Sequence, residues 1–445
     1  MKRADYVFFL NKRFLQAATG VLFLLVTGNF VPFVDVVAQL AFVVFCALSV
    51  LDFVLLLSGR KTPVTGSRRM ADRFSNGDDN QVKITIRNNI NYAIRGTIID
   101  ELPVQFQKHD FAIETQLTPG EEQSLNYGLR PVERGEYHFG RVLVFYSSPI
   151  GFFQRRVTIA PPAMVKVYPA FKEMRKYEMM AISNRLSEAG IKRIRQVGHQ
   201  MEFDQIRDYI KGDDYRTINW KATARKSHLM VNQYQEERSQ QMISVIDMGR
   251  TMQMPFNGMT LLDYAINTAL VMSNIAIVKH DKAGLVTFND EIQTVIPPRK
   301  ESHHIQTIME ALFNQQTTFA ECDYHPLYAT IKRKISQRSL LMLYCNFETI
   351  HALKRQLPVL QTLARQHLVV VIFFENSELA DFTLSEANDL EEIYTKTIAQ
   401  KFIYDKQLIT RFLEARGIHA ILTSPEKLTI DTLNKYLELK ARGLV

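Results

Sequence analysis

Two long apolar runs dominate the first 60 residues. They cover Phe14–Val34 and Val36–Leu57, and no Lys or Arg occurs from Phe14 to Gly59. Each run provides the roughly 20 residues that a helix needs to cross the hydrocarbon core of a membrane. Because Pro32 and Asp35 suit a tight turn, the pattern predicts a two-helix transmembrane hairpin over residues 1–60.

Basic residues flank the predicted hairpin on both sides. They are Lys2, Arg3, Lys12 and Arg13 before it, and Arg60, Lys61, Arg68 and Arg69 after it. Positive charge at both outer flanks predicts that the soluble domains face the cytoplasm. A cleaved signal peptide is the alternative, but it needs a short apolar core and a small-residue cleavage site. Asp52 lies inside the second run and is a candidate functional residue, although a position near the membrane interface or pairing within an oligomer is the simpler interpretation.

Short alternating runs follow in residues 61–175. Gln81–Arg87, Gly96–Asp100 and Arg141–Tyr146 alternate apolar and polar positions, which is typical of strands with one buried face. Turn-forming clusters such as Ser75–Asn80 and Pro119–Gly120 separate them. The pattern predicts a sandwich-like β-rich domain with a structural or protein-binding role.

Residues 241–445 alternate between strand and helix patterns. The strands are predicted at Met242–Ile246, Ala283–Phe288, Ile292–Ile296, Ser339–Cys345, Leu368–Phe374 and His419–Thr423. The helices are predicted at Leu262–His280, His303–Asn314, Ile350–His367, Lys401–Arg416 and Ile430–Lys440. This alternation is typical of an α/β fold with a parallel-rich sheet and helices on both faces. Ligands of such folds bind beyond the carboxyl ends of the strands.

The segment between these regions, residues 176–240, mixes aromatic, basic and acidic residues most densely. Gly212 can adopt positive φ, and Asp213 or Asp214 can then cap a short helix that starts near Tyr215. The residues expected to face the core are Ile218, Trp220 and Ala222, and those expected to pair with carboxylates are Arg207, Arg216 and Arg225. Three roles stay open for this segment: a buried knot between domains, an Arg-rich docking surface, and catalysis by paired carboxylates.

The string from Arg207 to Arg225 resembles the signature of the bacterial family of proteins of unknown function called DUF58. The positions that carry the resemblance are Arg207, Tyr209, Gly212, Asp213, Asp214, Arg216, Asn219, Trp220 and Arg225. In that family a membrane hairpin, a β-rich region, this signature and a von Willebrand factor A-like domain follow one another. The resemblance therefore implies a Rossmann-type, von Willebrand factor A-like C-terminal domain in a protein of the bacterial inner membrane. It also implies partnership with an AAA+ ATPase of the MoxR type.

A von Willebrand factor A-like domain directs attention to the end of its first strand, where a D-x-S-x-S string helps to hold a divalent cation. Here Asp247 and Thr251 take the outer positions of the string, and Gly249 removes one hydroxyl. The other expected ligands are Thr318, with Thr317 as the alternative, and Asn346 in place of an aspartate. Oxygen ligands of this kind suit Mg²⁺ or Mn²⁺, but the reduced charge favours a degenerate metal site.

Composition and charge exclude several classes of function. The chain has 445 residues with an ordinary globular balance, 46% hydrophobic and 22% charged, so it is neither disordered nor collagen-like. Lys192–Lys226 interleaves nine basic with five acidic residues, which favours a salt-bridged surface over a nucleic-acid track. The sequence contains no Gly-rich phosphate loop, so an ATPase is not expected.

Two functional hypotheses follow. The first is a non-enzymatic, membrane-anchored adaptor whose cytoplasmic domain binds protein partners and no nucleic acid. The alternative is a metal-dependent hydrolase that uses Asp213, Asp214 and Asp247. The sequence favours the adaptor, because it offers no base or nucleophile at a recognisable spacing.

Overall fold

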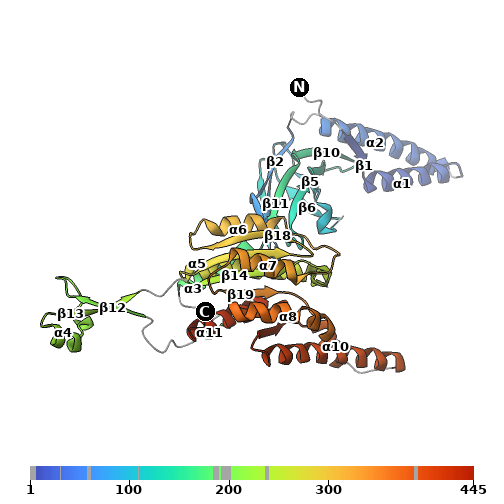
Figure 1. Ribbon diagram of the computed structural model, residues 1–445. Coiled ribbons are helices and arrows are strands. Elements are labelled where there is room, and N and C mark those ends of the chain that lie inside the picture. The colour runs from blue at the N-terminus through green and yellow to red at the C-terminus, as the bar shows by residue number, and fades with distance from the viewer. Residues whose placement is uncertain are drawn as a thin grey trace. The chain divides into compact units, whose positions relative to one another are not determined.

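The protein was analysed as a computed structural model, which describes residues 7–30, 32–57, 62–108, 110–183, 190–191, 202–235, 240–384 and 389–444. It contains both helices and sheets (Figure 1). The chain divides into two compact units, residues 1–168 and 169–445. The division predicted at residues 60, 175 and 240 stays a prediction. The flanking residues Lys2, Arg3, Arg60 and Lys61 lie outside the described residues.

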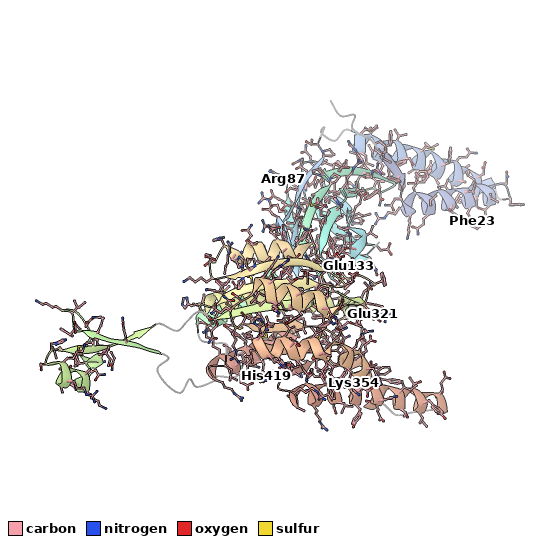
Figure 2. The ribbon with its side chains drawn as sticks, in the orientation of Figure 1. Phe23, Arg87, Glu133, Glu321, Lys354 and His419 are labelled. Carbon is pink, nitrogen blue, oxygen red and sulfur yellow. The ribbon has the colours of Figure 1, made fainter. Side chains whose placement is uncertain are left out.

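Two apolar helices, α1 (Lys12–Gly28) and α2 (Pro32–Leu57), lie near the N-terminus. Pro32 starts α2 because proline is pre-organised for the first helical position. The α1 helix ends at Gly28, earlier than predicted, and its 17 residues are fewer than the roughly 20 of a membrane span. Their large apolar side chains are exposed, as Phe23 shows with 68% of its surface accessible (Figure 2).

Among the described residues, two helices are long and apolar enough to cross a membrane. They are Phe33–Leu57 of α2 and α5 (Leu261–Val278). The α5 helix is mostly buried within the second unit, as expected for the core helix of a soluble domain. The length and hydropathy of α2 are those of a membrane-spanning helix, but a signal sequence near the N-terminus has the same properties.

The β-rich part of the first unit consists of three sheets. The first has the order β1-β10-β9-β5-β6, the second β2-β4-β7 and the third β3-β11-β8. The strand bounds are Val7–Leu10 (β1), Val64–Met70 (β2), Arg73–Ser75 (β3), Asn80–Asn88 (β4), Ile94–Asp100 (β5), Ala112–Leu117 (β6), Glu122–Leu129 (β7), Gly135–Phe139 (β8), Val142–Ser147 (β9), Phe153–Ala160 (β10) and Ala163–Tyr168 (β11). Strand β4 buries every second residue, and its Ile84 and Ile86 share a core with Ile98 and Val144 of the first sheet. The sequence-based expectation of half-buried strands therefore holds.

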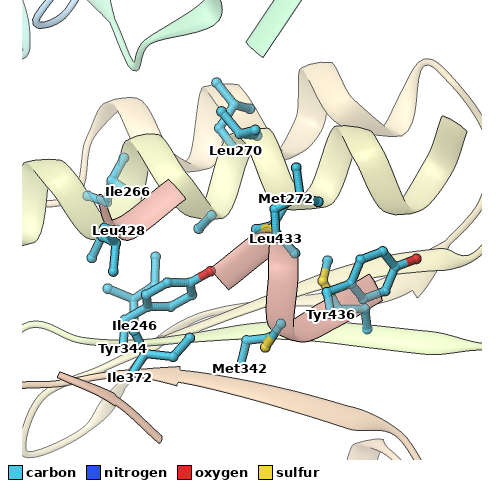
Figure 3. Close-up of a cluster of buried hydrophobic side chains, with 14 of the residues drawn as sticks. Ile246, Ile266, Leu270, Met272, Met342, Tyr344, Ile372, Leu428, Leu433 and Tyr436 are labelled. Carbon is cyan, nitrogen blue, oxygen red and sulfur yellow. The ribbon is translucent and has the colours of Figure 1, made fainter. Parts of the chain in front are cut away.

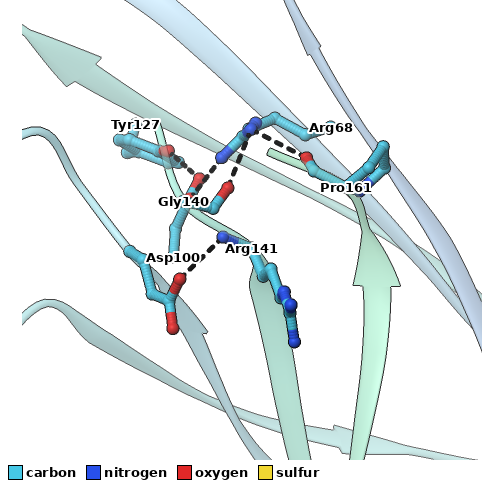
Figure 4. A network of polar contacts seen from close by, with 7 residues as sticks. Arg68, Asp100, Tyr127, Gly140, Arg141 and Pro161 are labelled. Carbon is cyan, nitrogen blue, oxygen red and sulfur yellow. Dashed lines mark hydrogen bonds and ion pairs between the residues drawn. The ribbon is translucent and has the colours of Figure 1, made fainter. Parts of the chain in front are cut away.

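A buried ion pair lies in this β-rich part. The Arg68 Nη1 atom is 2.6 Å from Asp100 Oδ1, and both side chains are almost completely buried. Arg68 also donates to the carbonyl oxygens of Gly140 and Pro161, while Tyr127 donates to Asp100 (Figure 4). Burial raises the pKa of Asp100, and the bonds from Tyr127 and Arg68 oppose that shift. Each charge therefore has several partners, as a buried ion pair requires.

The last turns of α2 are fastened to the turn between β9 and β10. Asp52 is completely buried, and its Oδ2 atom accepts hydrogen bonds of 2.8 Å from the backbone N–H groups of Phe152 and Phe153. The hydroxyl of Ser148 donates to the other oxygen of Asp52. Arg155 donates to the carbonyl oxygen of Leu56 at 2.8 Å. The Asp52 carboxylate thus accepts hydrogen bonds from two backbone N–H groups at this turn of the β-rich part.

The second unit is an α/β domain around a six-stranded sheet with the order β18-β17-β14-β19-β20-β21. Its strands are β14 (Gln241–Asp247), β17 (Lys282–Phe288), β18 (Ile292–Arg299), β19 (Leu340–Tyr344), β20 (Leu368–Phe374) and β21 (His419–Thr423). All neighbours are parallel except β17 and β18. The predicted parallel-rich sheet is therefore confirmed.

Helices pack against this sheet through two apolar clusters. These helices are α3 (Phe171–Ile182), α5, α6 (His304–Phe313), α7 (Tyr324–Lys334), α8 (Ile350–Gln366), α10 (Leu390–Glu414) and α11 (Leu428–Ala441). A further helix, α9 (Ser377–Leu384), contacts α10. In one cluster Ile246 and Tyr344 of the sheet meet Ile266 of α5 and Leu433 of α11 (Figure 3). The other cluster contains Leu327 of α7 together with residues of α8 and α10. Strand β14 contributes Met242 and Ile246 to the first cluster and Ile243 and Val245 to the second, because successive side chains of a strand point to opposite faces of the sheet.

The signature segment folds into a small hairpin of its own. It contains β12 (Glu202–Asp208), a 3-10 turn at Tyr215–Thr217, α4 (Trp220–Lys226) and β13 (Met230–Gln235) (Figure 1). Strands β12 and β13 pair antiparallel.

Candidate functional site

Asp247 lies at the carboxyl end of the central strand β14, as the sequence predicts. Its Oδ1 atom accepts hydrogen bonds from the Gly249 backbone N–H at 2.8 Å and from the Cys322 thiol at 2.7 Å. Its Oδ2 atom accepts one from the Tyr324 hydroxyl at 3.2 Å. Burial raises the pKa of the Asp247 carboxyl, while the bonds from Cys322, Gly249 and Tyr324 oppose that shift. The carboxylate therefore ties together two loops and the start of α7.

The absence of a side chain at residue 249 is explained by Cys322. A Cβ atom on Gly249 would lie 2.7 Å from the Cys322 sulphur, closer than real Cβ contacts. The space that a serine would need is therefore filled by the thiol, which itself donates to Asp247. Burial and the neighbouring Asp247 carboxylate raise the pKa of Cys322, so its thiol stays protonated and keeps this bond.

Asn346 follows β19, on the strand next to β14. Its Nδ2 group donates to the backbone oxygen of Thr251 at 3.1 Å. Its Oδ1 atom accepts a hydrogen bond of 2.8 Å from the ammonium group of Lys406, a residue of α10. Lys406 also donates to the carbonyl oxygen of Phe374 at the end of β20. Burial lowers the pKa of Lys406 to about 8, although Glu348 and the other acidic neighbours oppose the shift.

The four predicted metal ligands are only partly brought together. Asp247, Thr251 and Asn346 line one cavity, whereas the Thr318 hydroxyl faces Asn289, whose Nδ2 atom lies 3.4 Å away. The Thr318 backbone N–H binds the Met248 oxygen at 3.0 Å, so its loop does run beside β14. Both oxygens of Asp247 and the Oδ1 atom of Asn346 already accept hydrogen bonds. This donor set does not fit a tightly held Mg²⁺ or Mn²⁺ ion, which needs free oxygen ligands. Within the described ranges, no three His, Cys, Asp or Glu side chains are grouped as metal ligands.

The cavity at this edge has a volume of about 350 Å³. Exposed Arg250, His351 and Arg355 line it, together with Glu321 and Glu348. Two of the lining residues, Arg355 and Glu321, form an ion pair of 2.9 Å. Such a mixture of exposed charges around a fixed loop scaffold suits the recognition of another polar surface.

In the signature hairpin, the predicted local bonds are largely present. Arg207 holds Asp213 by two hydrogen bonds, of 2.8 and 2.7 Å, and Asp213 also accepts from the Ile210 N–H. Gly212 has φ of +118°, as predicted. Asp214 caps the 3-10 turn and Asn219 caps α4.

The expectation that Trp220 faces the core is wrong. Its side chain is 69% exposed, as is that of Tyr215. Arg216 lies over the Tyr215 ring rather than in a described ion pair, and Arg225 is exposed. Trp220 is exposed because it begins a helix of only two turns, whose other face packs on β13 through the bond from the Met230 N–H to Thr223.

Three side chains that bond to Asp247 or Asn346 at the carboxyl ends of the central strands were not identified from the sequence. Cys322 and Tyr324 lie about 75 residues from Asp247, and Lys406 lies 60 residues from Asn346. A sequence signal existed only for Tyr324, which follows Asp323, the N-cap of α7. Pro326 in the first turn of that helix is tolerated there.

Comparison with known proteins places the signature in its family. Residues 205–402 match the sequence model of the family described as "Protein of unknown function DUF58". The uncharacterized protein YeaD of Bacillus subtilis is 23% identical over 255 residues, which are 56% of this chain and 60% of that protein. The chain thus spans less than two thirds of the length of this relative.

Solved structures with partial similarity include the conserved hypothetical protein BatB of Bacteroides thetaiotaomicron. It is 11% identical and covers 46% of this chain and all of that chain, with a TM-score of 0.30. A CARDB domain from Pyrococcus furiosus covers 23% of this chain and 86% of that chain, at 12% identity and a TM-score of 0.18. The residues that match the family model include the signature from Arg207 to Arg225. Residues 205–402 of the chain therefore match the DUF58 family, whose function is unknown.

Proposed function

We propose that this protein is a membrane-anchored adaptor without enzymatic activity, whose α/β unit binds a protein partner at the edge formed by Asp247 and Asn346. In this proposal α1 and α2 form a two-pass anchor in the bacterial inner membrane. The soluble parts face the cytoplasm, and the α/β unit is of the von Willebrand factor A type. The proposed partner is an AAA+ ATPase of the MoxR type, which rests on the family resemblance.

The bonding of Asp247 is the observation that carries this proposal. A general base needs a carboxylate that can reach a substrate proton. Asp247 instead accepts hydrogen bonds from Gly249, Cys322 and Tyr324, and so holds the loops that contain Gly249 and Cys322 in place. The loops that it fastens present Arg250 at the rim of the cavity.

A metal-dependent hydrolase, the alternative, gains less support from the same contacts. Asp213 is held by Arg207, Asp214 caps a turn, and Asp247 is buried. Each of the three carboxylates thus has a local structural role. An adaptor needs no Mg²⁺ or Mn²⁺ here, because Lys406 already supplies a positive charge at Asn346. The proposed adaptor binds a protein partner at this edge and no nucleic acid.

A crosslinked pull-down from native membranes in mild detergent tests the adaptor. Full-length protein should recover the AAA+ ATPase, and Arg250→Glu should reduce recovery, because it reverses a charge at the cavity rim. Lys354→Glu is the matched control, since Lys354 is an exposed residue of α8 outside the cavity lining. Equal recovery with both variants would contradict the assigned surface, and metal-dependent turnover abolished by Asp213→Asn would favour the hydrolase.

Cysteine labelling of intact cells tests the orientation. A Lys354→Cys variant, with Cys46 replaced by alanine, should react with a membrane-impermeant maleimide only after the cells are opened. Cys322 and Cys345 give little background, because burial raises the pKa of both thiols. Labelling in intact cells would place the α/β unit outside and refute the proposal.

A further inference from the structure

The signature hairpin carries an exposed surface that the adaptor function does not use. We call it the tip surface, and it consists of Ile210, Lys211, Tyr215, Arg216, Trp220, Lys221, Arg225, Lys226 and Leu229, all of them exposed. Two backbone bonds bring these residues to one end of the hairpin. They join the Tyr209 N–H to the Leu229 oxygen at 2.9 Å and the Asn219 N–H to the Met230 oxygen at 2.8 Å.

The tip surface has a net positive charge that internal contacts do not neutralise. Residues 207–229 contain six basic and three acidic side chains. Asp213 is held by Arg207, Asp214 caps the 3-10 turn, and Asp208 lies 2.8 Å from His228. Lys211, Lys221 and Lys226 have no ion pair with a described residue. Glu202 and Asp204 begin β12, at the opposite end of the hairpin.

Apolar side chains accompany this charge. Trp220 and Tyr215 are each 69% exposed, and Ile210 is 64% exposed. Tryptophan and tyrosine together with basic residues are typical of surfaces that bind at the membrane–water interface. Lysine is depleted in protein–protein interfaces, yet it supplies three of the five unpaired cations here.

We propose that the tip surface binds anionic phospholipid headgroups, with Trp220 and Ile210 at the boundary of the acyl chains. Each lysine or arginine near an anionic leaflet contributes attraction that depends on the lipid charge. The proposal rests on the anchor proposed above in one respect. A hairpin tethered to the same bilayer meets the lipid at a high effective concentration, so a weak affinity is sufficient.

The only tryptophan of the protein is Trp220, so intrinsic fluorescence of the full chain reports on the tip surface directly. The full-length protein is incorporated into nanodiscs of phosphatidylcholine alone or with phosphatidylglycerol. In discs with phosphatidylglycerol we expect blue-shifted emission, less quenching by aqueous acrylamide, and quenching by lipids with brominated acyl chains. Discs of phosphatidylcholine alone should leave Trp220 in water.

A charge variant shows whether the lysines produce this difference. Lys221→Gln with Lys226→Gln should lower the effective affinity about fivefold for each residue removed. High salt should have a similar effect. The matched control is Lys354→Gln with Lys401→Gln, which removes the same charge from exposed positions on α8 and α10. Equal spectra for the two double variants would refute a role for the tip lysines.

The outcomes separate this inference from the anchor. If the protein does not enter nanodiscs at all, the proposed anchor is wrong. If it enters discs with phosphatidylglycerol but Trp220 stays accessible to acrylamide, the lipid-binding tip surface is wrong. A spectral shift produced by poly-glutamate or by duplex DNA, but not by phosphatidylglycerol, would instead assign the tip surface to an acidic protein or to nucleic acid.

Discussion

The ammonium group of Lys406 lies 2.8 Å from the Oδ1 atom of Asn346, at the carboxyl edge of the central strands. The chain itself therefore supplies a positive charge, the Lys406 ammonium group, at the carboxyl ends of these strands. Lys406 also binds the end of β20, so it connects α10 with two neighbouring strands. Its position is a reason why Asn346 is available to neither a metal nor a substrate.

Lys406 should make stability depend on pH. Its folded-state pKa of about 8 lies below the usual lysine value, so the unfolded chain binds more protons between these two pH values. Stability should therefore rise as the pH increases from about 8 toward 10.5, by roughly 3 kcal/mol at most. Lys406→Met should lose this rise in denaturant titrations of the full chain, whereas Lys401→Met should keep it. An unchanged pH dependence in Lys406→Met would contradict the assignment.

Gly249 and Cys322 should be energetically coupled. Gly249→Ala should destabilise the α/β unit, by about 1–3 kcal/mol, because the new methyl group meets the Cys322 sulphur. In a Cys322→Ala background the same change should cost less, since the sulphur is gone. A double-mutant cycle measured by hydrogen exchange of β14 gives the coupling energy. Additive effects would mean that the methyl group introduced at residue 249 and the Cys322 sulphur do not compete for this space.

Arg68 should be essential for the β-rich part. Arg68→Met leaves Asp100 buried without its cation, which costs about 3–5 kcal/mol. The pKa of Asp100 should then rise further, so the variant should be more stable at pH 5 than at pH 8. Arg69→Met, at the exposed neighbouring position, is the control. Thermal unfolding at both pH values measures the difference, and equal melting temperatures for the two variants would count against the buried pair.

Asp52 should hold the turn between β9 and β10. Asp52→Ala removes the acceptor of the Phe152 and Phe153 N–H groups, which then exchange with solvent more readily. Hydrogen exchange of the full-length protein in detergent should be at least several-fold faster at these two amides. Asp35→Ala, near the start of α2, should leave them protected. Unchanged protection in Asp52→Ala would show that the turn is held by other contacts.

Local patterns in the sequence predicted most of the α/β elements, with differences at their ends. The predicted strand at Leu368–Phe374 agrees with β20, because a fully buried strand is a continuous apolar run. The helix predicted at Lys401–Arg416 begins eleven residues earlier, at Leu390. Its first half was missed because Ile393, Tyr394 and Ile398 are exposed there, while Lys396 and Ala399 are buried, so no stripe of large apolar residues marks the buried face.

The sequence by itself determined the alternation of strands and helices, the apolar N-terminal runs and the match of residues 205–402 to their family, because each of these is encoded by neighbouring residues. It also determined that Asp247 ends the first strand of the α/β unit. The tertiary structure alone decided what surrounds that carboxylate. Cys322, Tyr324 and Lys406 reach the edge only because parallel strands bring distant loops to the same end of the sheet. Residues that meet in this way are separated by whole helices, so no local spacing can indicate the contact.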